Sequence, residues 1–400
     1  MPPTGNSTLD TALHDSASLI ALQKTAPVGG FALIERARQD LTPLTTALHS
    51  YGYYKAQIIA TIDGAPLDTP DLASRIDHLP ANPPVPVDIR FDLGPLFHLG
   101  AVSIQGAVPP DARATLALTP GQPALAADVV GAQGRLLTAI RDDGYPMAKV
   151  TLPPATLHLP QNLLDVQFIA DTGPRAPIGP ITITGLKHMH EGFVRRRLLL
   201  HQGERFSPAA INKARDDLQS LGVFSVVRIV PLQHLDAQGR LPLTVEVTET
   251  PLHAVDAGVG YSTDLGLNFN AGWHHRNLFG HAEQLNLTAA MNLGGDAEVH
   301  PGYQFGAQFI KPDFLARDQS LEIDLNAVKQ DLQAYDQTAL LEKALLNRKL
   351  SPHWAFSYGV SGEQEAITQE GVERHYELLG LPLALKLDNT NRMLDPTQGI

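Results

Sequence analysis

The sequence predicts an array of α+β units up to about residue 252, followed from residue 253 by antiparallel strands of a membrane-spanning β-barrel. Two observations support this division. Apolar and polar residues alternate strictly in several segments after Ala254, which is typical of strands with one apolar and one polar face. Before residue 252, a glycine and proline pattern occurs twice, 79 residues apart, beginning at Gly94 and at Gly173. Repeats at a fixed period indicate an array of similar modules.

Composition excludes several classes of protein. The chain has 42 acidic and 30 basic residues and a formal net charge of −12, whereas nucleic-acid-binding proteins usually present a basic face. It has no cysteine, which excludes thiolate metal sites and disulfide bonds. Hydrophobic residues make up 43% of the chain, which is enough for folded cores. No apolar run reaches the roughly 20 residues of a transmembrane helix, and the first residues do not resemble a signal peptide.

The first 94 residues contain signals for both helices and strands. We expect a short helix around Thr11–Lys24 and a longer one over Phe31–Ser50, where apolar residues follow a helical stripe despite Pro43. A turn and a strand should follow, then an acidic, proline-rich loop over residues 62–84, and then a strand over residues 85–94.

The repeated pattern has the form Gly-Pro-x4-Gly-x5-Gly. Its residues are Gly94, Pro95, Gly100 and Gly106 in one copy and Gly173, Pro174, Gly179 and Gly185 in the other. The surrounding sequence has the order strand, helix, helix, Gly-aromatic turn, strand, loop, strand. We therefore expect three β-α-α-β-β units, at residues 1–94, 95–173 and 174–252, with the Gly-Pro pairs stiffening the joints between units. The alternative is that these pairs only mark ordinary loops.

Residues 253–400 contain about eight candidate strands. Alternation is clearest over residues 265–273, 285–293 and 303–309, and further candidates occupy residues 319–329, 352–363 and 374–388. Residues 333–350 fit a helix nearly as well as a strand. If the alternation marks a membrane barrel, the apolar faces contact lipid, and a wet lumen receives Asn268, Asn270, Glu322 and Asp324. The alternative is a soluble β-sandwich or lipocalin-like barrel with the same alternation turned inside out.

No motif in the sequence carries catalytic or cofactor-binding chemistry. Residues 359–362 lack the Gly-x-Ser-x-Gly spacing of a nucleophile elbow. An alternating strand pattern follows Gly258-Val259-Gly260, where a dinucleotide-binding loop would need a helix. We therefore expect a protein that is not an enzyme and that uses neither a metal nor a cofactor.

Clusters of polar residues have ordinary explanations. His188 and His190, and the adjacent His274 and His275, lack the spacing of a metal site and are expected to be surface or lumen histidines. Arg195-Arg196-Arg197 should end a helix of the third unit, with contact to lipid headgroups as the alternative. Paired carboxylates such as Asp216-Asp217 are expected on solvated faces.

Three segments carry a resemblance to a known family. The strand-helix-helix-strand-strand units resemble POTRA domains. The sequence ETPLHAVDAGVGYSTDLGLNFNAGWHHRNLFGHAEQLNL resembles the start of the barrel in the outer-membrane insertase superfamily. LDNTNRMLDPTQG resembles the mid-barrel signature of the bacterial surface antigen family, carried here by Asp388, Asn389, Asp395, Pro396 and Gly399. Three POTRA-like units together with GVGYSTDLG are most similar to TamA-like members, since BamA-like members normally carry five units and two-partner secretion transporters carry two.

The resemblance implies an outer-membrane protein whose residues 1–252 lie in the periplasm, with an export signal that is not part of this chain. Barrels of the family have sixteen strands, so it also implies the N-terminal half of a barrel, truncated at mid-barrel. The implied activity is assembly or translocation of outer-membrane proteins, including autotransporters. The implied partners are unfolded clients of these kinds, a TamB-like periplasm-spanning subunit and the lipid bilayer. A BamA-like general insertase, a two-partner secretion pore and a passive structural envelope protein are the alternatives.

Two sets of site residues follow from these considerations. The first barrel strand should form one side of a weak barrel seam that can open and pair with a client strand, because glycines weaken a strand. Its residues are Ala254, Val255, Asp256, Gly258, Gly260 and Tyr261. The second set should form the turn between the second and third barrel strands, and comprises Arg276, Asn277, Phe279 and Gly280.

Overall fold

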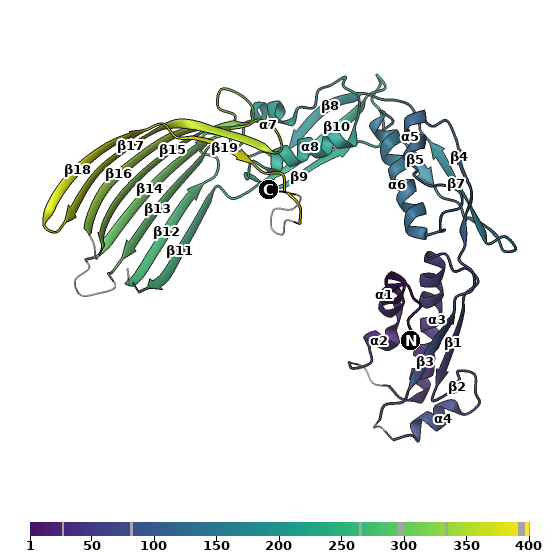
Figure 1. The fold of residues 1–400 in the computed structure, drawn as a ribbon. Coiled ribbons are helices and arrows are strands. Elements are labelled where there is room, and N and C mark those ends of the chain that lie inside the picture. Colours follow the sequence, from purple (N-terminus) through teal and green to yellow (C-terminus); the bar gives the residue numbers. More distant parts are fainter. Residues whose placement is uncertain are drawn as a thin grey trace. The chain divides into compact units, whose positions relative to one another are not determined.

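A computed structural model describes residues 1–25, 28–80, 83–263, 266–294, 300–332, 335–390 and 397–399. The chain forms two compact units, of which one comprises Met1–Ala176 with Arg205–Pro208 and the other Pro177–Glu204 with Ala209–Ile400. Small α+β repeats occupy the N-terminal part of the sequence and a large sheet the C-terminal part (Figure 1). Within the described ranges, no helix has the length and apolar character needed to cross a membrane.

The first repeat consists of helices followed by a small sheet. Its elements are α1 (Ser7–Ser16), α2 (Ser18–Ala21), α3 (Gly30–Ser50), β1 (Gln57–Ile62), β2 (Ala65–Pro66), α4 (Leu72–Asp77) and β3 (Val87–Asp92). The strand order is β2-β1-β3, and β1 pairs with β3 in antiparallel register. Leu44 and Leu48 of α3 pack against Leu9 and Leu13 of α1 and Ile89 of β3, which joins helices and sheet in one core.

Two sequence predictions are wrong in this repeat. The expected β-α-α-β-β order needs a first strand, but the described residues before α3 form helices. Leu9 and Leu13 are one helical turn apart and fully buried, and the Asn6 side chain accepts hydrogen bonds from the first turn of α1. The segment expected to be a loop over residues 62–84 contains β2 and α4, because Leu72 and Ile76, also one turn apart, are buried in the core that includes Ile34 of α3.

The second repeat has the expected strand and helix order, with one additional short strand in the connection that was expected to be a loop. Its elements are β4 (His98–Gln105), α5 (Pro110–Ala114), α6 (Ala126–Asp142), β5 (Lys149–Thr151), β6 (Thr156–His158) and β7 (Leu163–Asp171). The central strand β7 is parallel to β4 and antiparallel to β5 and β6. Helix α6 packs a stripe that includes Leu136 and Ile140 against Val166 and Phe168 of β7.

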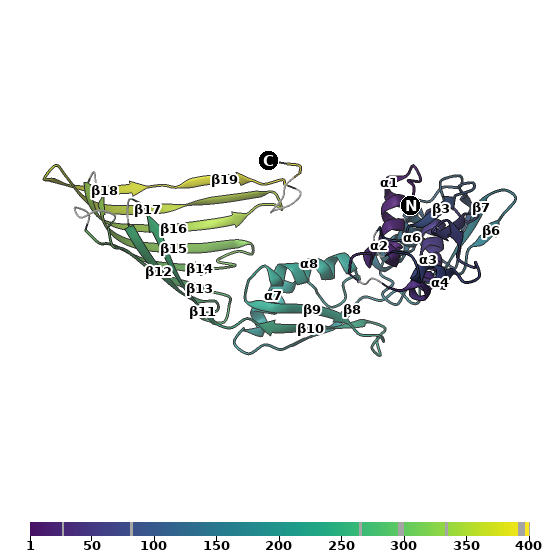
Figure 2. The ribbon, with the colours of Figure 1, turned by 90° about the horizontal axis from the view of Figure 1, so that it is seen from below.

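The third repeat has the expected β-α-α-β-β order without an additional strand. Its elements are β8 (Ile178–Thr184), α7 (Glu191–Leu198), α8 (Pro208–Gln219), β9 (Phe224–Pro231) and β10 (Leu241–Glu249). The strand order is β8-β10-β9, with β8 parallel and β9 antiparallel to β10, and α8 lies on one face of this sheet (Figure 2). Leu99 exchanges backbone hydrogen bonds with Gly121 and Gln122, and Ile178 does the same with Gly203 and Glu204. The second and third repeats therefore contain equivalent backbone hydrogen bonds as well as similar sequence patterns.

The remaining strands form one antiparallel sheet in chain order (Figures 1 and 2). They are β11 (His253–Ser262), β12 (Gly266–His275), β13 (Gln284–Asn292), β14 (Gly302–Lys311), β15 (Gln319–Leu332), β16 (Tyr335–Lys349), β17 (Trp354–Gln369), β18 (Val372–Gly380) and β19 (Leu383–Leu387). Strands β18 and β19 pair with successive halves of β17, so the sheet is eight strands wide. The segment that fitted helix and strand equally is the strand β16.

The two faces of the large sheet differ in polarity. Val255, Trp273, Leu287, Ala307 and Leu325 are successive cross-strand partners from β11 to β15 and so share one face. The neighbouring row on the other face is polar and passes through His274, Asn286, Gln308, Asp324 and Lys343. We call these the apolar face and the polar face.

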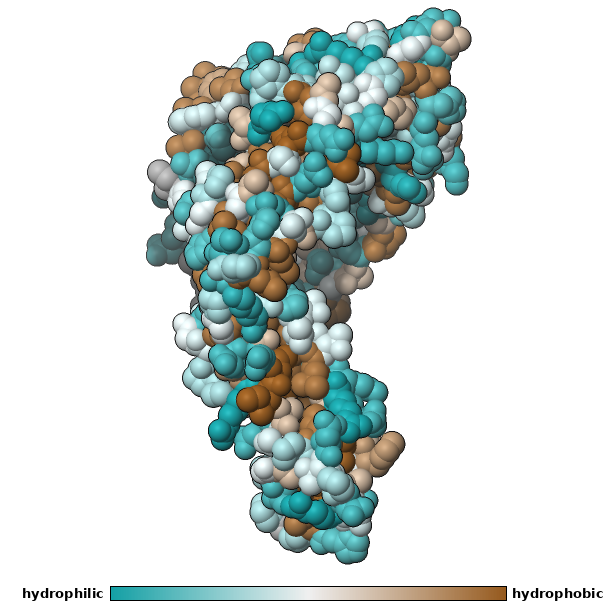
Figure 3. Space-filling model, turned by 90° about the vertical axis from the view of Figure 1, so that its right-hand side faces the viewer, coloured by the Kyte–Doolittle hydropathy of each residue, from teal (hydrophilic) through white to brown (hydrophobic). Residues whose placement is uncertain are grey.

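The apolar face is exposed and is not the core of a soluble domain. Val255 is 76% and Phe305 60% accessible, whereas a soluble sandwich or lipocalin-like barrel would bury such residues. Figure 3 shows another face of the molecule, on which groups of hydrophobic residues are interspersed with hydrophilic ones. A contiguous exposed apolar surface of this kind is typical of contact with a membrane or with another protein.

Candidate functional site

Strand β11 forms one edge of the large sheet and contains every residue predicted for the seam. It pairs with β12 from His253↔His275 to Ser262↔Gly266, and its other edge has no partner strand in the described part of the chain. An unpaired edge presents a row of backbone N–H and C=O groups that can add a further strand.

The two glycines of β11 face asparagines on the neighbouring strand. Gly258 is the cross-strand partner of Asn270, and Gly260 is the partner of Asn268. A Cβ atom at either glycine would lie 2.6 Å from the Oδ1 atom of its partner asparagine. The missing side chains therefore make room for the asparagines and also weaken β11, since glycine in a strand interior has no side chain to pack.

The link between the third repeat and β11 is short and held by Glu249, the last residue of β10. Its carboxylate accepts hydrogen bonds from the backbone N–H groups of Lys187, His188 and Met189 at 2.7–3.0 Å. The His188 imidazole lies 3.0 Å from the same carboxylate, whose side chain is only 6% exposed. Burial by itself would raise the pKa of Glu249, but the three N–H groups and His188 together hold this pKa below its ordinary value.

The predicted turn residues lie in the connection between β12 and β13, next to the same loop of the third repeat. The Arg276 guanidinium donates to the Pro251 carbonyl, and the Asn277 side chain accepts from Ala282 N–H. The His190 N–H donates to the Gly280 carbonyl at 2.9 Å. Gly280 has φ +88°, and a Cβ there would lie 2.5 Å from the His190 ring, so both conformation and space require glycine. The Phe279 side chain is exposed.

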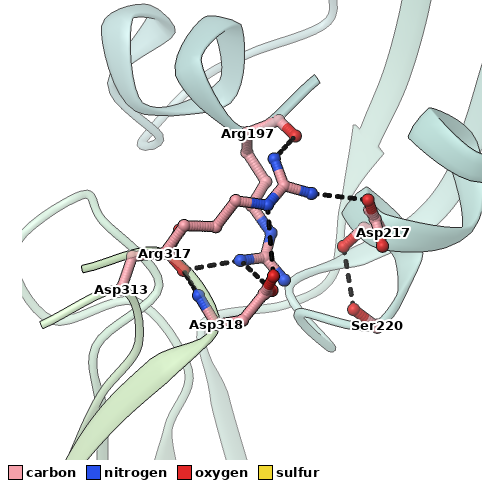
Figure 4. Close-up of polar contacts among 6 residues, drawn as sticks. All are labelled: Arg197, Asp217, Ser220, Asp313, Arg317 and Asp318. Atoms are coloured by element: carbon pink, nitrogen blue, oxygen red, sulfur yellow. Dashed lines mark hydrogen bonds and ion pairs between the residues drawn. The ribbon is translucent and has the colours of Figure 1, made fainter. Parts of the chain in front are cut away.

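A second contact between the third repeat and the large sheet is an ion-pair cluster (Figure 4). Arg197, in the last turn of α7, lies 2.5 Å from Asp313 and 3.1 Å from Asp318, both in the connection between β14 and β15. Its side chain is only 9% exposed. In return, Arg317 of the same connection donates to the Arg197 carbonyl at 2.8 Å and pairs with Asp217 of α8 at 2.5 Å. We call these five residues the junction cluster.

The junction cluster also stabilises an unusual backbone. Asp313, Leu315 and Asp318 all adopt left-handed φ angles of +50° to +61°, which costs roughly 1 kcal/mol or more per non-glycine residue. The Asp318 N–H donates to the Asp313 carboxylate at 3.1 Å, so Asp313 contacts both Arg197 and the turn. The cluster therefore fixes the connection between β14 and β15 against α7 and α8.

The joint glycines have the conformations that their sequence pattern requires. Gly94 and Gly173 have φ of +62° and +60°, and their N–H groups donate to Asp92 and Asp171, two residues earlier in each case. Gly106 and Gly185 also have positive φ. At Gly100 and Gly179 a Cβ would collide with Asp165 or Leu241. Their role in stiffening the joints, beside Pro95 and Pro174, stays a prediction.

The mid-barrel signature is described only in part. The Asp388 side chain accepts hydrogen bonds from Thr390 just after β19, and Asn389 and Gly399 are also described. Asp395 and Pro396 lie outside the described residues. Among the residues that the structure describes, no group of three His, Asp or Glu side chains could hold a metal ion.

Sequence reasoning missed the junction cluster. Asp217 was expected on a solvated face, yet it pairs with Arg317, 100 residues later. Arg197 does lie in the last turn of a helix, as expected, but a buried pairing to Asp313 and Asp318 has no local signature. The available signal was its spacing: Arg197 follows Phe193 and Val194 by four and three residues, which places it on the apolar side of the helix.

Comparisons with known proteins agree with this geometry. Residues 176–250 match the POTRA family, described as the surface antigen variable number repeat, and residues 277–400 match the Omp85 superfamily domain. These matches support the Omp85 superfamily. The POTRA domain is the third repeat, and the large sheet of β11–β19 resembles part of an Omp85 barrel.

Two curated relatives are outer membrane protein assembly factors that match part of this chain. The outer membrane protein assembly factor BamA of Buchnera aphidicola subsp. Acyrthosiphon pisum is 24% identical over 149 residues, which are 37% of this chain and 24% of that protein. BamA of Neorickettsia risticii is 31% identical over 108 residues, which are 27% of this chain and 14% of that protein. The chain thus matches about a quarter or less of these relatives.

One solved structure shows the same fold. The crystal structure of BamA from Haemophilus ducreyi lacking POTRA domains 1–3 has a TM-score of 0.62 and 17% sequence identity, and covers 76% of this chain and 61% of that one. An antiparallel sheet that follows a POTRA domain is therefore the architecture of both proteins.

Proposed function

We propose that this chain belongs to an outer-membrane protein assembly factor, in which β11 pairs with a strand of the protein being assembled, the client. The observation that carries the proposal is the exposed edge of β11, weakened by Gly258 and Gly260 and following directly on a POTRA domain. The names of the BamA relatives support assembly as the activity. Residues 1–252 would lie in the periplasm and the apolar face in the bilayer.

Membrane insertion gives the edges of the sheet a physical requirement. Lipid offers no hydrogen bonds to unpaired backbone groups, so β11 and the β18/β19 edge both need partners inside the membrane. We propose that further barrel strands supply them and that the junction with β11 is the weak one. A client strand could then replace the weak pairing by edge addition, without nucleotide hydrolysis.

A finer proposal concerns the branch of the superfamily. The three repeats before the large sheet favour a TamA-like factor that assembles autotransporters and works with a TamB-like periplasm-spanning subunit. The BamA relatives favour a general insertase instead. Two experiments on the complete protein should separate these roles. Affinity purification should recover a long periplasmic partner only for the TamA-like role. Depletion should give a defect limited to autotransporters only for that role.

Disulfide cross-linking tests the central proposal. Because the 400 residues contain no cysteine, single cysteines can be placed in β11 at Val255, Ala257 or Val259 and combined with cysteines in the last strand of a client. An assembly factor should give cross-links in a register that shifts with the client position. If the protein is a secretion pore, the client cysteine should instead cross-link to cysteines placed on the polar face. A passive envelope protein should give neither product.

A further inference from the structure

The polar face carries a continuous chain of side-chain contacts that starts at the edge strand. Asp256 of β11 lies 2.6 Å from Nε2 of His274 on β12, and His274 Nδ1 lies 2.9 Å from Oδ1 of Asn286 on β13. Asn286 donates to Gln308 of β14 at 3.0 Å, and Gln308 donates to Glu322 of β15 at 3.2 Å. We call these five residues the polar ladder.

The far end of the ladder is anchored by charge. Asn347 of β16 donates to Glu322 at 2.8 Å, and the Lys343 ammonium lies 3.9 Å from the same carboxylate and 2.8 Å from Asp324. The ladder and Asn347 together therefore join the edge strand to five further strands. Among the strands that the structure describes, backbone hydrogen bonds link β11 only to β12.

The direction of donation along the ladder follows from its last member. A carboxylate only accepts, so Gln308 presents its NH₂ group to Glu322 and its carbonyl oxygen to Asn286. Asn286 then presents its NH₂ group to Gln308 and its oxygen to His274. The His274 Nδ1 atom must consequently carry a hydrogen, because two acceptors cannot bond to each other.

Because of this direction, the contact between His274 and Asp256 depends on the protonation state of the pair. With Nδ1 protonated, a neutral imidazole has a bare lone pair at Nε2, which would face the lone pairs of an ionised Asp256. The contact of 2.6 Å is a hydrogen bond only if the pair holds one additional proton. The charged groups that face His274 among the described residues are Asp256 on β11 and Arg276, which follows the end of β12, and Asn286 on β13 is neutral.

The backbone leaves space for this contact. Gly272 is the cross-strand partner of Asp256, and a Cβ there would lie 2.5 Å from the Asp256 carboxylate and 2.9 Å from His274 Nε2. Any side chain at position 272 would thus push the two groups apart. Glycine is the residue that allows Asp256 and His274 to meet across the strand pair.

We propose that His274 is a positioning residue for β11, which it ties through Asp256 to the polar ladder, and that the tie holds only while the pair shares its extra proton. This inference rests on the proposed function, because it matters when β11 must part from its neighbours and pair with a client. Loss of the proton leaves β11 held by backbone hydrogen bonds that Gly258 and Gly260 already weaken. Low pH therefore strengthens the contact between β11 and β12, and high pH weakens it.

Hydrogen exchange of the β11 amides in the complete protein, without client, tests the tie. After correction for intrinsic exchange rates, protection should be on the order of fivefold higher at about pH 5.5 than at about pH 8.5, on either side of the ordinary imidazole range, as for a partly exposed ion pair. Asp256→Ala should give low protection at both pH values. Asp256→Asn should give high protection at both, because its NH₂ group can donate to the neutral ring.

A control and a functional assay separate this inference from the proposed function. His275→Gln changes the adjacent histidine on the opposite face and should retain the pH dependence of the wild-type protein. Wild-type protection that varies with pH no more than in Asp256→Ala would overturn the tie. In the client cross-linking assay, yield at β11 should rise in Asp256→Ala and at high pH in the wild-type protein. Exchange that follows the expected pattern without any client cross-link would instead overturn the assembly role of β11 and, with it, the positioning role of His274.

Discussion

The junction cluster gives the sharpest prediction for the connection between the POTRA domain and the large sheet. Arg197→Met keeps an unbranched apolar stem at the buried position but removes the guanidinium group and its charge. Asp313 and Asp318 then lose their cation, while Arg317 can still donate to the backbone carbonyl at position 197. The connection between β14 and β15 should open more often, because its left-handed residues lose the contacts that hold them.

The magnitude follows from the exposure of the partners. Removing one member of a fully buried ion pair costs about 3–5 kcal/mol. The Arg197 side chain is 9% exposed, but those of Asp313 and Asp318 are 20% and 39% exposed, so water compensates part of the loss. We expect Arg197→Met to lower the free energy of local opening by about 2 kcal/mol, which corresponds to a roughly 30-fold larger opening equilibrium constant.

Hydrogen exchange measured on the complete protein provides the assay. The Asp318 amide, which donates to Asp313, and the amides of α7 should exchange about 30-fold faster in Arg197→Met. Arg196→Met is the matched control, because it makes the same substitution at the neighbouring exposed position. If Arg197→Met exchanges no faster than Arg196→Met at these amides, the cluster does not hold the junction and the reasoning is refuted.

Three further predictions concern β11 and its connections. Alanine at Gly258 and Gly260 would displace the Oδ1 atoms of Asn270 and Asn268, which are the ends of flexible side chains and can rotate away. The two replacements should therefore stabilise β11 by roughly 0.5–1 kcal/mol per site and reduce client cross-linking; undiminished cross-linking in variants whose β11 exchange is slower would argue against a weak seam. Glu249 has a lowered pKa in the folded state. Its contribution to stability is therefore complete at pH values above the ordinary glutamate pKa of about 4.3 and is lost as pH falls through the folded-state pKa. Protection of the Lys187–Met189 amides should therefore fall in acid in the wild-type protein, whereas in Glu249→Gln it should be lower at neutral pH and nearly constant; an equal acid loss in both would contradict this role. Gly280→Ala should destabilise the junction by about 1–3 kcal/mol because of its positive φ and the His190 ring, visible as faster exchange at His190, and unchanged exchange there would count against the contact.

The parts of the fold that were predictable are those in which local pattern and tertiary environment agree. Strands β12, β13 and β14 were visible because each exposes one apolar face and so alternates strictly. The repeats were visible because Gly94 and Gly173 need left-handed angles that few other residues adopt. The helix α4 was hidden in an acidic, proline-rich segment, since only Leu72 and Ile76 signal its buried side.

Other features depend on partners that are distant in sequence. LLEKALLNRKL fits a helix by its leucine spacing, but β15 and β17 offer backbone partners on both sides, and strand pairing prevails in β16. The junction cluster joins α7 and α8 to a connection about 100 residues later, and the polar ladder together with Asn347 spans six strands. Contacts of this kind follow no local periodicity, so no sequence pattern predicts them.

The most direct test of the account is whether the apolar face contacts hydrocarbon. The two tryptophans of the 400 residues, Trp273 and Trp354, supply the probes, since Trp273 lies on this face and Trp354 is paired with Leu387 at the far edge of the sheet. The complete protein should be reconstituted in bilayers of lipids brominated along their acyl chains, with Trp273→Phe and Trp354→Phe used to separate the two signals. We predict strong quenching of both tryptophans by the brominated lipids and little by aqueous iodide; the opposite pattern would contradict the placement of this face in the membrane.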